Sequence, residues 1–160
     1  MGLLLIEQAF NGLQFGVMLF LIAAGLTLVF GIMDLVNLSH GSLVMVGAYL
    51  ATTLIEWTGS FILGILLALP STFLVGVVVE IVVLRTLYER DHLDQVLATF
   101  GLILFFNELI RIVWGPASLY SGLPESISGH VEILPGVPYP AFRLLIILVG
   151  LLVALLIYFI

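Results

Sequence analysis

Four long runs of apolar residues dominate the sequence, and short polar segments separate them. Each run is long enough, or nearly so, to cross a bilayer as a helix, which takes about 20 residues. A fifth apolar run is shorter and, at about 1.5 Å per residue, reaches only about 20 Å. In chain order, the predicted helical runs are Ala9–Met33, Leu43–Ile55 (the short one), Phe61–Leu84, Gln95–Trp114 and Ala141–Ile160. The pattern predicts an all-α, polytopic transmembrane bundle of about five spans.

The segment between the first two runs carries five polar side chains in a short space: Asp34, Asn37, Ser39, His40 and Ser42. Because the run that follows is short, either the bilayer thins there or part of this segment lies below the membrane surface. Irregular backbone at that depth survives only inside protein or beside a water-filled cavity. We therefore predict a broken helix near residues 33–42, with Asn37, Ser39 and His40 at least partly buried.

Local chemistry favours this break. Asn37 and Ser39 are good N-cap residues for the helix that follows, and Gly31 and Gly41 tolerate positive φ. Broken helices in transporters expose helix termini and free carbonyl groups to solutes. The residues expected to line a substrate pathway or to form the structural break are Asn37, Ser39, His40, Gly41 and Ser42.

Two charged residues, Glu108 and Arg111, lie three positions apart inside the predicted span 95–114. This spacing allows them to pair on one helix face. Charged groups within spans are costly and usually face a bundle interior or a cavity. Two interpretations stand: a structural pair near the outer interface, or a role in lining the pathway.

Smaller signals concern packing and orientation. Gly12 with Gly16, and Gly64 with Ala68, are pairs of small residues at the spacing that lets helices approach closely in lipid. The segment 115–140 is rich in Pro, Gly and Ser and is predicted to lie outside the hydrocarbon, with a short strand at "HVEIL". Arg85 and Arg90 favour a cytoplasmic position for the loop 85–94.

The composition agrees with a lipid environment. The 160-residue chain is 62% hydrophobic and only 9% charged, whereas soluble chains carry about 25% charged residues. The formal charge of −6 is spread over short loops, so no nucleic-acid partner is inferred. The absence of cysteine excludes disulfides, thiolate nucleophiles and cysteine-based metal sites.

The sequence offers no catalytic constellation. Ser39 and His40 are adjacent, so their side chains cannot easily adopt nucleophile–base geometry, and no third orienting group is evident. His40, His92 and His130 fall in three separate loops, which argues against a metal site. The phosphate-binding pattern G-x-x-x-x-G-K-[ST] does not occur, so ATP hydrolysis by that route is excluded. We therefore expect no enzyme activity and no cofactor. Transport is the leading class, ahead of a passive channel or an intramembrane enzyme.

At residues 25–51, "GLTLVFGIMDLVNLSHGSLVMVGAYLA", the chain resembles the membrane subunit of branched-chain amino-acid ABC transporters, of the leucine/isoleucine/valine uptake type. The matching positions are Gly31, Ile32, Val36, Asn37, Leu38, Ser39, His40, Gly41, Met45, Val46, Gly47, Ala48 and Tyr49. Residues 84–116, "LRTLYERDHLDQVLATFGLILFFNELIRIVWGP", resemble the family's fourth span and the segment before it.

The resemblance implies a multi-pass permease subunit of a bacterial inner (plasma) membrane. It implies as partners a second homologous permease subunit, two cytoplasmic ATPase subunits and an extracytoplasmic substrate-binding protein. The motif does not separate amino-acid permeases from relatives that carry urea or short amides. Family members are close to twice this length, so residues 1–160 are interpreted as the N-terminal part of a single transmembrane permease domain. We expect such a piece to be inactive in uptake by itself.

Overall fold

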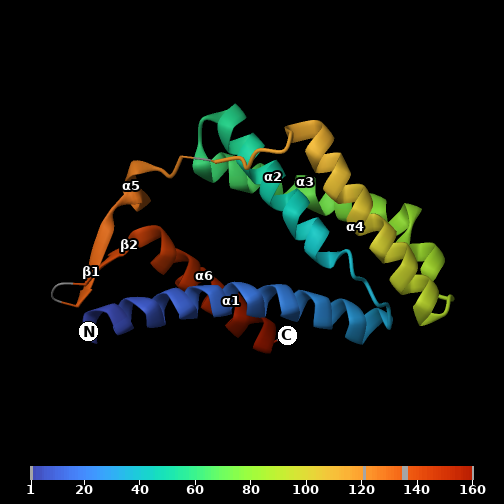
Figure 1. The fold of residues 1–160 in the computed structure, drawn as a ribbon, viewed down its shortest axis with the longest axis horizontal. Coiled ribbons are helices and arrows are strands. Elements are labelled where there is room, and N and C mark those ends of the chain that lie inside the picture. The colour runs from blue at the N-terminus through green and yellow to red at the C-terminus, as the bar shows by residue number, and fades with distance from the viewer. Residues whose placement is uncertain (1, 121, 135–136, 160) are drawn as a thin grey trace. The chain divides into compact units, whose positions relative to one another are not determined.

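The structure is a computed structural model that describes residues 2–120, 122–134 and 137–159. The chain folds into two compact units, one made of Met1–Gly25 with Leu123–Ile160 and the other of Leu26–Gly122. In chain order the elements are α1 (Gly2–Met33), α2 (His40–Thr58), α3 (Phe61–Val82), the 3₁₀ turn η1 (Leu84–Leu87), α4 (His92–Trp114), α5 (Glu125–Ser128), β1 (His130–Leu134), β2 (Val137–Pro140) and α6 (Ala141–Phe159) (Figure 1).

The predicted fold class is confirmed: the chain is a helical, multi-pass membrane protein. Within the described residues, four helical segments are long and apolar enough to cross a membrane: Leu4–Met33, Phe61–Leu87, His92–Trp114 and Ala141–Phe159. The fifth predicted run forms α2, which is not among these four. Pro70 lies inside α3, and the helix continues through it.

The predicted bounds of the fifth run, 43–55, were too narrow. Helix α2 has 19 residues, or about 28 Å at 1.5 Å per residue. The residues of α2 outside 43–55 are more polar but still helical, because the backbone conformation, and not hydrophobicity, determines where a helix ends. Gly59, with φ 63°, takes the left-handed conformation that ends α2, as glycine commonly does after a helix. A short span therefore does not explain the burial of the break, and packing within the protein must.

In the unit Leu26–Gly122, helices α2 and α3 form a hairpin that small residues hold closely together. A Cβ at Gly64 would lie 2.6 Å from both Cα and N of Ile55, and Ala68 one turn later is buried. A Cβ at Gly47 of α2 would lie 3.2 Å from Thr72 Cγ2. The prediction that Gly64 and Ala68 form a packing surface is confirmed.

Helix α4 completes this unit by packing against α2. Near its C-terminal end the Trp114 indole donates a 2.8 Å hydrogen bond to Thr53 Oγ1, and its ring lies 5.4 Å from that of Tyr49. The buried apolar core of the unit consists of Leu35, Val46, Val79, Leu84, Leu87, Phe106 and Ile110.

In the other unit, the β1–β2 hairpin and α6 pack on the first part of α1. The predicted strand at residues 130–134 is confirmed as β1, which pairs antiparallel with β2. Tyr139 of β2 is fully buried, and its hydroxyl donates to Asn11 Oδ1 at 3.1 Å. Arg143 Nη1 of α6 donates to the same oxygen at 2.7 Å. Asn11 is thus the polar anchor of this unit.

The predicted close packing through Gly12 and Gly16 does not appear within this unit. A Cβ at either glycine would meet nothing within 4 Å. The close approach between α1 and α6 lies at Gly150, where a Cβ would clash with Val17.

The α2–α3 contact gives a prediction for two substitutions in one helix. Gly64→Ala should lower the free energy of unfolding by about 1–3 kcal/mol, because the backbone of Ile55 must move. Gly76→Ala should raise it by up to about 1 kcal/mol, since a Cβ there meets nothing within 4 Å and alanine favours helix. Denaturant titration of the protein in detergent micelles measures both. A Gly64→Ala protein as stable as wild type would contradict the contact.

Candidate functional site

The predicted break is confirmed: α1 ends at Met33 and α2 begins at His40. Asp34 ends α1 in the left-handed conformation, with φ 49°, and its N–H donates to Phe30 O at 2.9 Å. Gly31 and Gly41, which tolerate positive φ, do not adopt it, because both lie inside helices. Aspartate is among the few non-glycine residues enriched in this conformation, so the turn needs no glycine.

A tight turn centred on Asn37 and Ser39 forms the middle of the break. Asn37 Oδ1 accepts hydrogen bonds from Ser39 N at 3.0 Å and from Ser39 Oγ at 2.6 Å. Both side chains are buried, with exposed fractions of 3% and 0%. Ser39 is the N-cap residue of α2, as predicted, but its side chain makes no capping hydrogen bond. Its hydroxyl is committed to Asn37, so the pair stabilises the turn itself.

The remaining predicted site residues follow directly in the first turn of α2. His40 is partly buried, Gly41 is exposed and Ser42 is buried. The predicted burial of Asn37, Ser39 and His40 is therefore confirmed. His40 and Gly41 are the members of the set that keep accessible surface.

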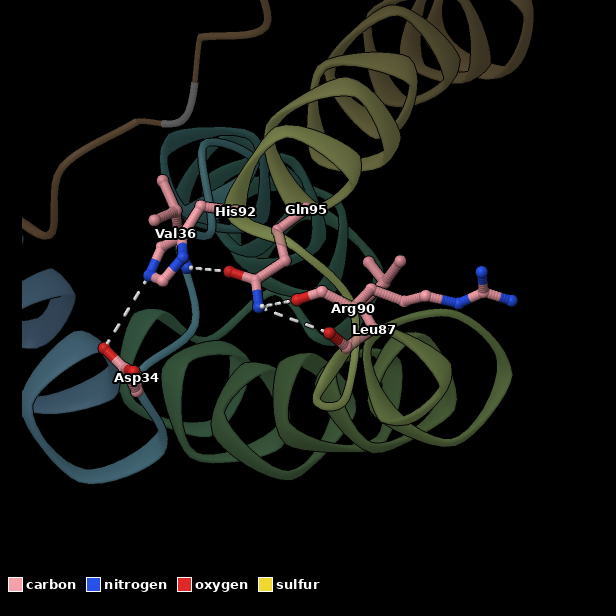
Figure 2. A network of polar contacts seen from close by, with 6 residues as sticks. All are labelled: Asp34, Val36, Leu87, Arg90, His92 and Gln95. Atoms are coloured by element: carbon pink, nitrogen blue, oxygen red, sulfur yellow. Dashed lines mark hydrogen bonds and ion pairs between the residues drawn. The ribbon is translucent and has the colours of Figure 1, made fainter.

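Gln95, on the first turn of α4, holds the break through backbone groups. Its Oε1 accepts a hydrogen bond from Val36 N at 3.0 Å. Its Nε2 donates to the carbonyl oxygens of Leu87 and Arg90, each at 3.2 Å (Figure 2). The side chain is only 2% exposed, so these three bonds satisfy a buried amide.

Thr99 lies one turn further along α4 and is fully buried. Its hydroxyl donates to Gln95 O at 2.7 Å and accepts from Leu38 N at 3.3 Å. Val36 O is also within 3.3 Å of this hydroxyl. Neither residue was predicted from the sequence to belong to the site. Their four-residue spacing within an apolar run, which puts two polar groups on one helix face, was the available signal.

The charged groups around the break are exposed. His92 Nε2 lies 3.9 Å from Asp34 Oδ1, and both side chains are well exposed. An ion pair of this kind contributes little to stability. Burial is the main cause, and nearby Glu80 a second one, that together raise the pKa of the Tyr88 phenol to about 12. The phenol oxygen has no hydrogen-bond partner in the described part of the chain, so we attribute the effect of Glu80 to its charge.

Glu108 and Arg111 do not belong to this site. Both are exposed on α4, and Glu108 lies thirteen residues after Gln95, about 20 Å along the helix. Among the residues that the structure describes, no ion pair joins the two. Their spacing allows pairing but does not impose it. The described residues also hold no group of three or more His, Cys, Asp or Glu side chains placed to bind a metal ion.

An apolar cavity of about 240 Å³ lies beside the break. The end of α1 and the break itself line it, through Leu26, Thr27, Phe30, Leu35, Val36, Asn37 and Leu38. The polar turn at Asn37 and Ser39 thus lies next to this apolar cavity.

Fold and site together define a multi-pass helical membrane protein with a broken, internally hydrogen-bonded polar segment between two helices. Residues 8–160 match the family described as branched-chain amino acid transport system / permease component, and the chain belongs to this family.

Curated relatives agree with this assignment. The chain is 31% identical over 116 residues to the high-affinity branched-chain amino acid transport system permease protein BraD of Pseudomonas aeruginosa, covering 67% of this chain and 38% of that protein. It is 27% identical over 141 residues to the permease protein LivH of Escherichia coli K12, covering 79% of this chain and 45% of LivH. The chain thus spans less than half the length of these relatives. No solved structure matches it.

The contacts of Thr99 give a prediction about the break. Thr99→Val removes the acceptor of the Leu38 N–H and should lower the free energy of unfolding by about 1–3 kcal/mol. Thr52→Val is the matched control, because its hydroxyl bonds only to Ala48 O of the same helix in the described structure. We expect that control to change stability by no more than about 0.5 kcal/mol. Equal effects of the two substitutions in a denaturant titration would argue against the role of Thr99.

Proposed function

We propose that the chain forms part of the translocation pathway for branched-chain amino acids in an ABC importer. The family match over residues 8–160 carries this proposal. The names of the relatives BraD and LivH support the solute class. The buried break supports a transport role, because broken helices in transporters expose helix termini and carbonyl groups to solutes.

The five residues predicted to form the break or line a pathway have different roles in this proposal. Asn37, Ser39 and Ser42 are buried and shape the segment, while His40 and Gly41 keep surface that a solute can reach. The N-terminus of α2 carries the positive end of the helix dipole, which favours a carboxylate. The adjoining cavity is lined mainly by apolar side chains, which suits an aliphatic side chain.

The proposal includes partners that supply energy and substrate. Two cytoplasmic ATPase subunits would drive the cycle, as in other ABC importers. A second homologous permease subunit would complete the pathway, and an extracytoplasmic binding protein would deliver the amino acid. The site of action would be the bacterial inner membrane, with the break and the loop 85–94 on the cytoplasmic side.

Glu108 and Arg111 also have a place in this proposal. Both side chains are exposed in the described structure, and charge facing lipid is costly. In the assembled transporter they would face protein or a water-filled pathway, either paired with each other or lining that pathway.

Leucine uptake by the assembled transporter tests the proposal. Asn37→Leu and His40→Leu should each lower uptake at least about tenfold while the protein still reaches the membrane. Leucine keeps the bulk in both, but it removes the acceptor of the Ser39 bonds at Asn37 and the polar group that a solute can reach at His40. Thr52→Val should transport normally, since its hydroxyl bonds within α2.

Competition by unlabelled solutes separates the solute classes in the same assay. Isoleucine and valine should compete with labelled leucine, and urea or short amides should not. Wild-type uptake in both break variants would refute the role of the break. Competition by urea alone would assign the protein to the amide-carrying relatives.

A further inference from the structure

The side chain of Gln95 joins two segments that are separate along the chain. One is the break, contacted at the backbone N–H of Val36. The other is the connection between α3 and α4, contacted at the carbonyl oxygens of Leu87 and Arg90. Figure 2 shows the amide between them, with its oxygen toward Val36 and its nitrogen toward the two carbonyls.

An amide side chain offers one acceptor oxygen and two donor hydrogens. In Gln95 each hydrogen reaches a different carbonyl and the oxygen takes one N–H, in a site only 2% exposed. If either segment moved away, a buried polar group would lose its partner, at a cost well above that of an exposed hydrogen bond. Moving the two segments together therefore costs little free energy, whereas separating them costs much more.

We propose that Gln95 is a positioning residue that transmits displacement of the α3–α4 connection, residues 84–91, to the break at residues 36–38. The consequence for transport rests on the proposed function: a force applied to this connection would reach the pathway through Gln95. Thr99 does not link the break to this connection, because in the described structure its contacts join the break only to α4 itself.

The connection has the properties of a movable element. It begins with the 3₁₀ turn η1, whose hydrogen-bond geometry is poorer than that of an α-helix. Most of its side chains are exposed, namely Arg85, Thr86, Glu89, Arg90 and Asp91. Leu84 and Leu87 anchor it in the apolar core. Elements with exposed backbone hydrogen bonds open at lower free energy than core helices.

Amide hydrogen exchange in lipid nanodiscs tests the link without substrate or ATP. Thr86→Gly loosens the connection at an exposed site, where the Thr86 hydroxyl bonds to Val83 O. We expect it to raise exchange of the Val36 N–H roughly threefold, in line with the backbone freedom of glycine. Gln95→Met should raise that exchange about tenfold, and adding Thr86→Gly to it should then change nothing further at Val36.

Thr99→Val is the matched control, because it disturbs the break while leaving Gln95 in place. Thr86→Gly should still raise Val36 exchange roughly threefold in that background. If Gln95→Met does not fold, Gln95→Glu keeps an acceptor for Val36 N–H but lacks the two amide donors, and the same loss of response is expected.

The proposal is overturned if Thr86→Gly leaves Val36 exchange unchanged in wild type, or raises it equally in the Gln95 variants. Because uptake plays no part in this assay, its failure would leave the transport proposal standing. Failure of the uptake tests would likewise leave the exchange result intact.

Discussion

Backbone N–H and C=O groups that leave a helix inside a membrane protein must find other partners, since hydrocarbon offers none. The segment between α1 and α2 meets this demand with three side chains. The backbone N–H groups of Ser39, Val36 and Leu38 donate to side-chain oxygens. The acceptors are, in the same order, Asn37, Gln95 and Thr99. Without these bonds the break would lose the contacts that fix its position. The cavity beside the break and the start of α2 depend on that position.

Close packing makes these hydrogen bonds geometrically available. Gly64 lets α3 approach the backbone of α2, and α4 packs on α2 from another side. Leu35, within the break, is fully buried in the same apolar core as Phe106 of α4. Burial of such a side chain contributes about 1.5–3 kcal/mol. Apolar contacts and hydrogen bonds thus hold the break in a single position.

Periodicity and local chemistry were enough to predict the four long spans, the break and strand β1. They were not enough to identify Gln95 and Thr99, whose partners lie about sixty positions away in the sequence and become visible only in the fold. The left-handed residue of the break is Asp34, and the glycines at positions 31 and 41 gave no indication of this. The C-terminal end of α2 was missed because the backbone conformation at Gly59, rather than hydrophobicity, ends the helix.

The two units differ in when they can be completed during synthesis. The unit Leu26–Gly122 is contiguous, so its contacts become available as the chain emerges. Asn11, by contrast, finds its partner Tyr139 only 128 residues later. Domains fold largely as units during translation, so the first part of α1 must wait in the membrane with Asn11 unsatisfied by Tyr139. During that interval Asn11 also lacks the Arg143 contact, so neither of the bonds that fix this part of α1 is available.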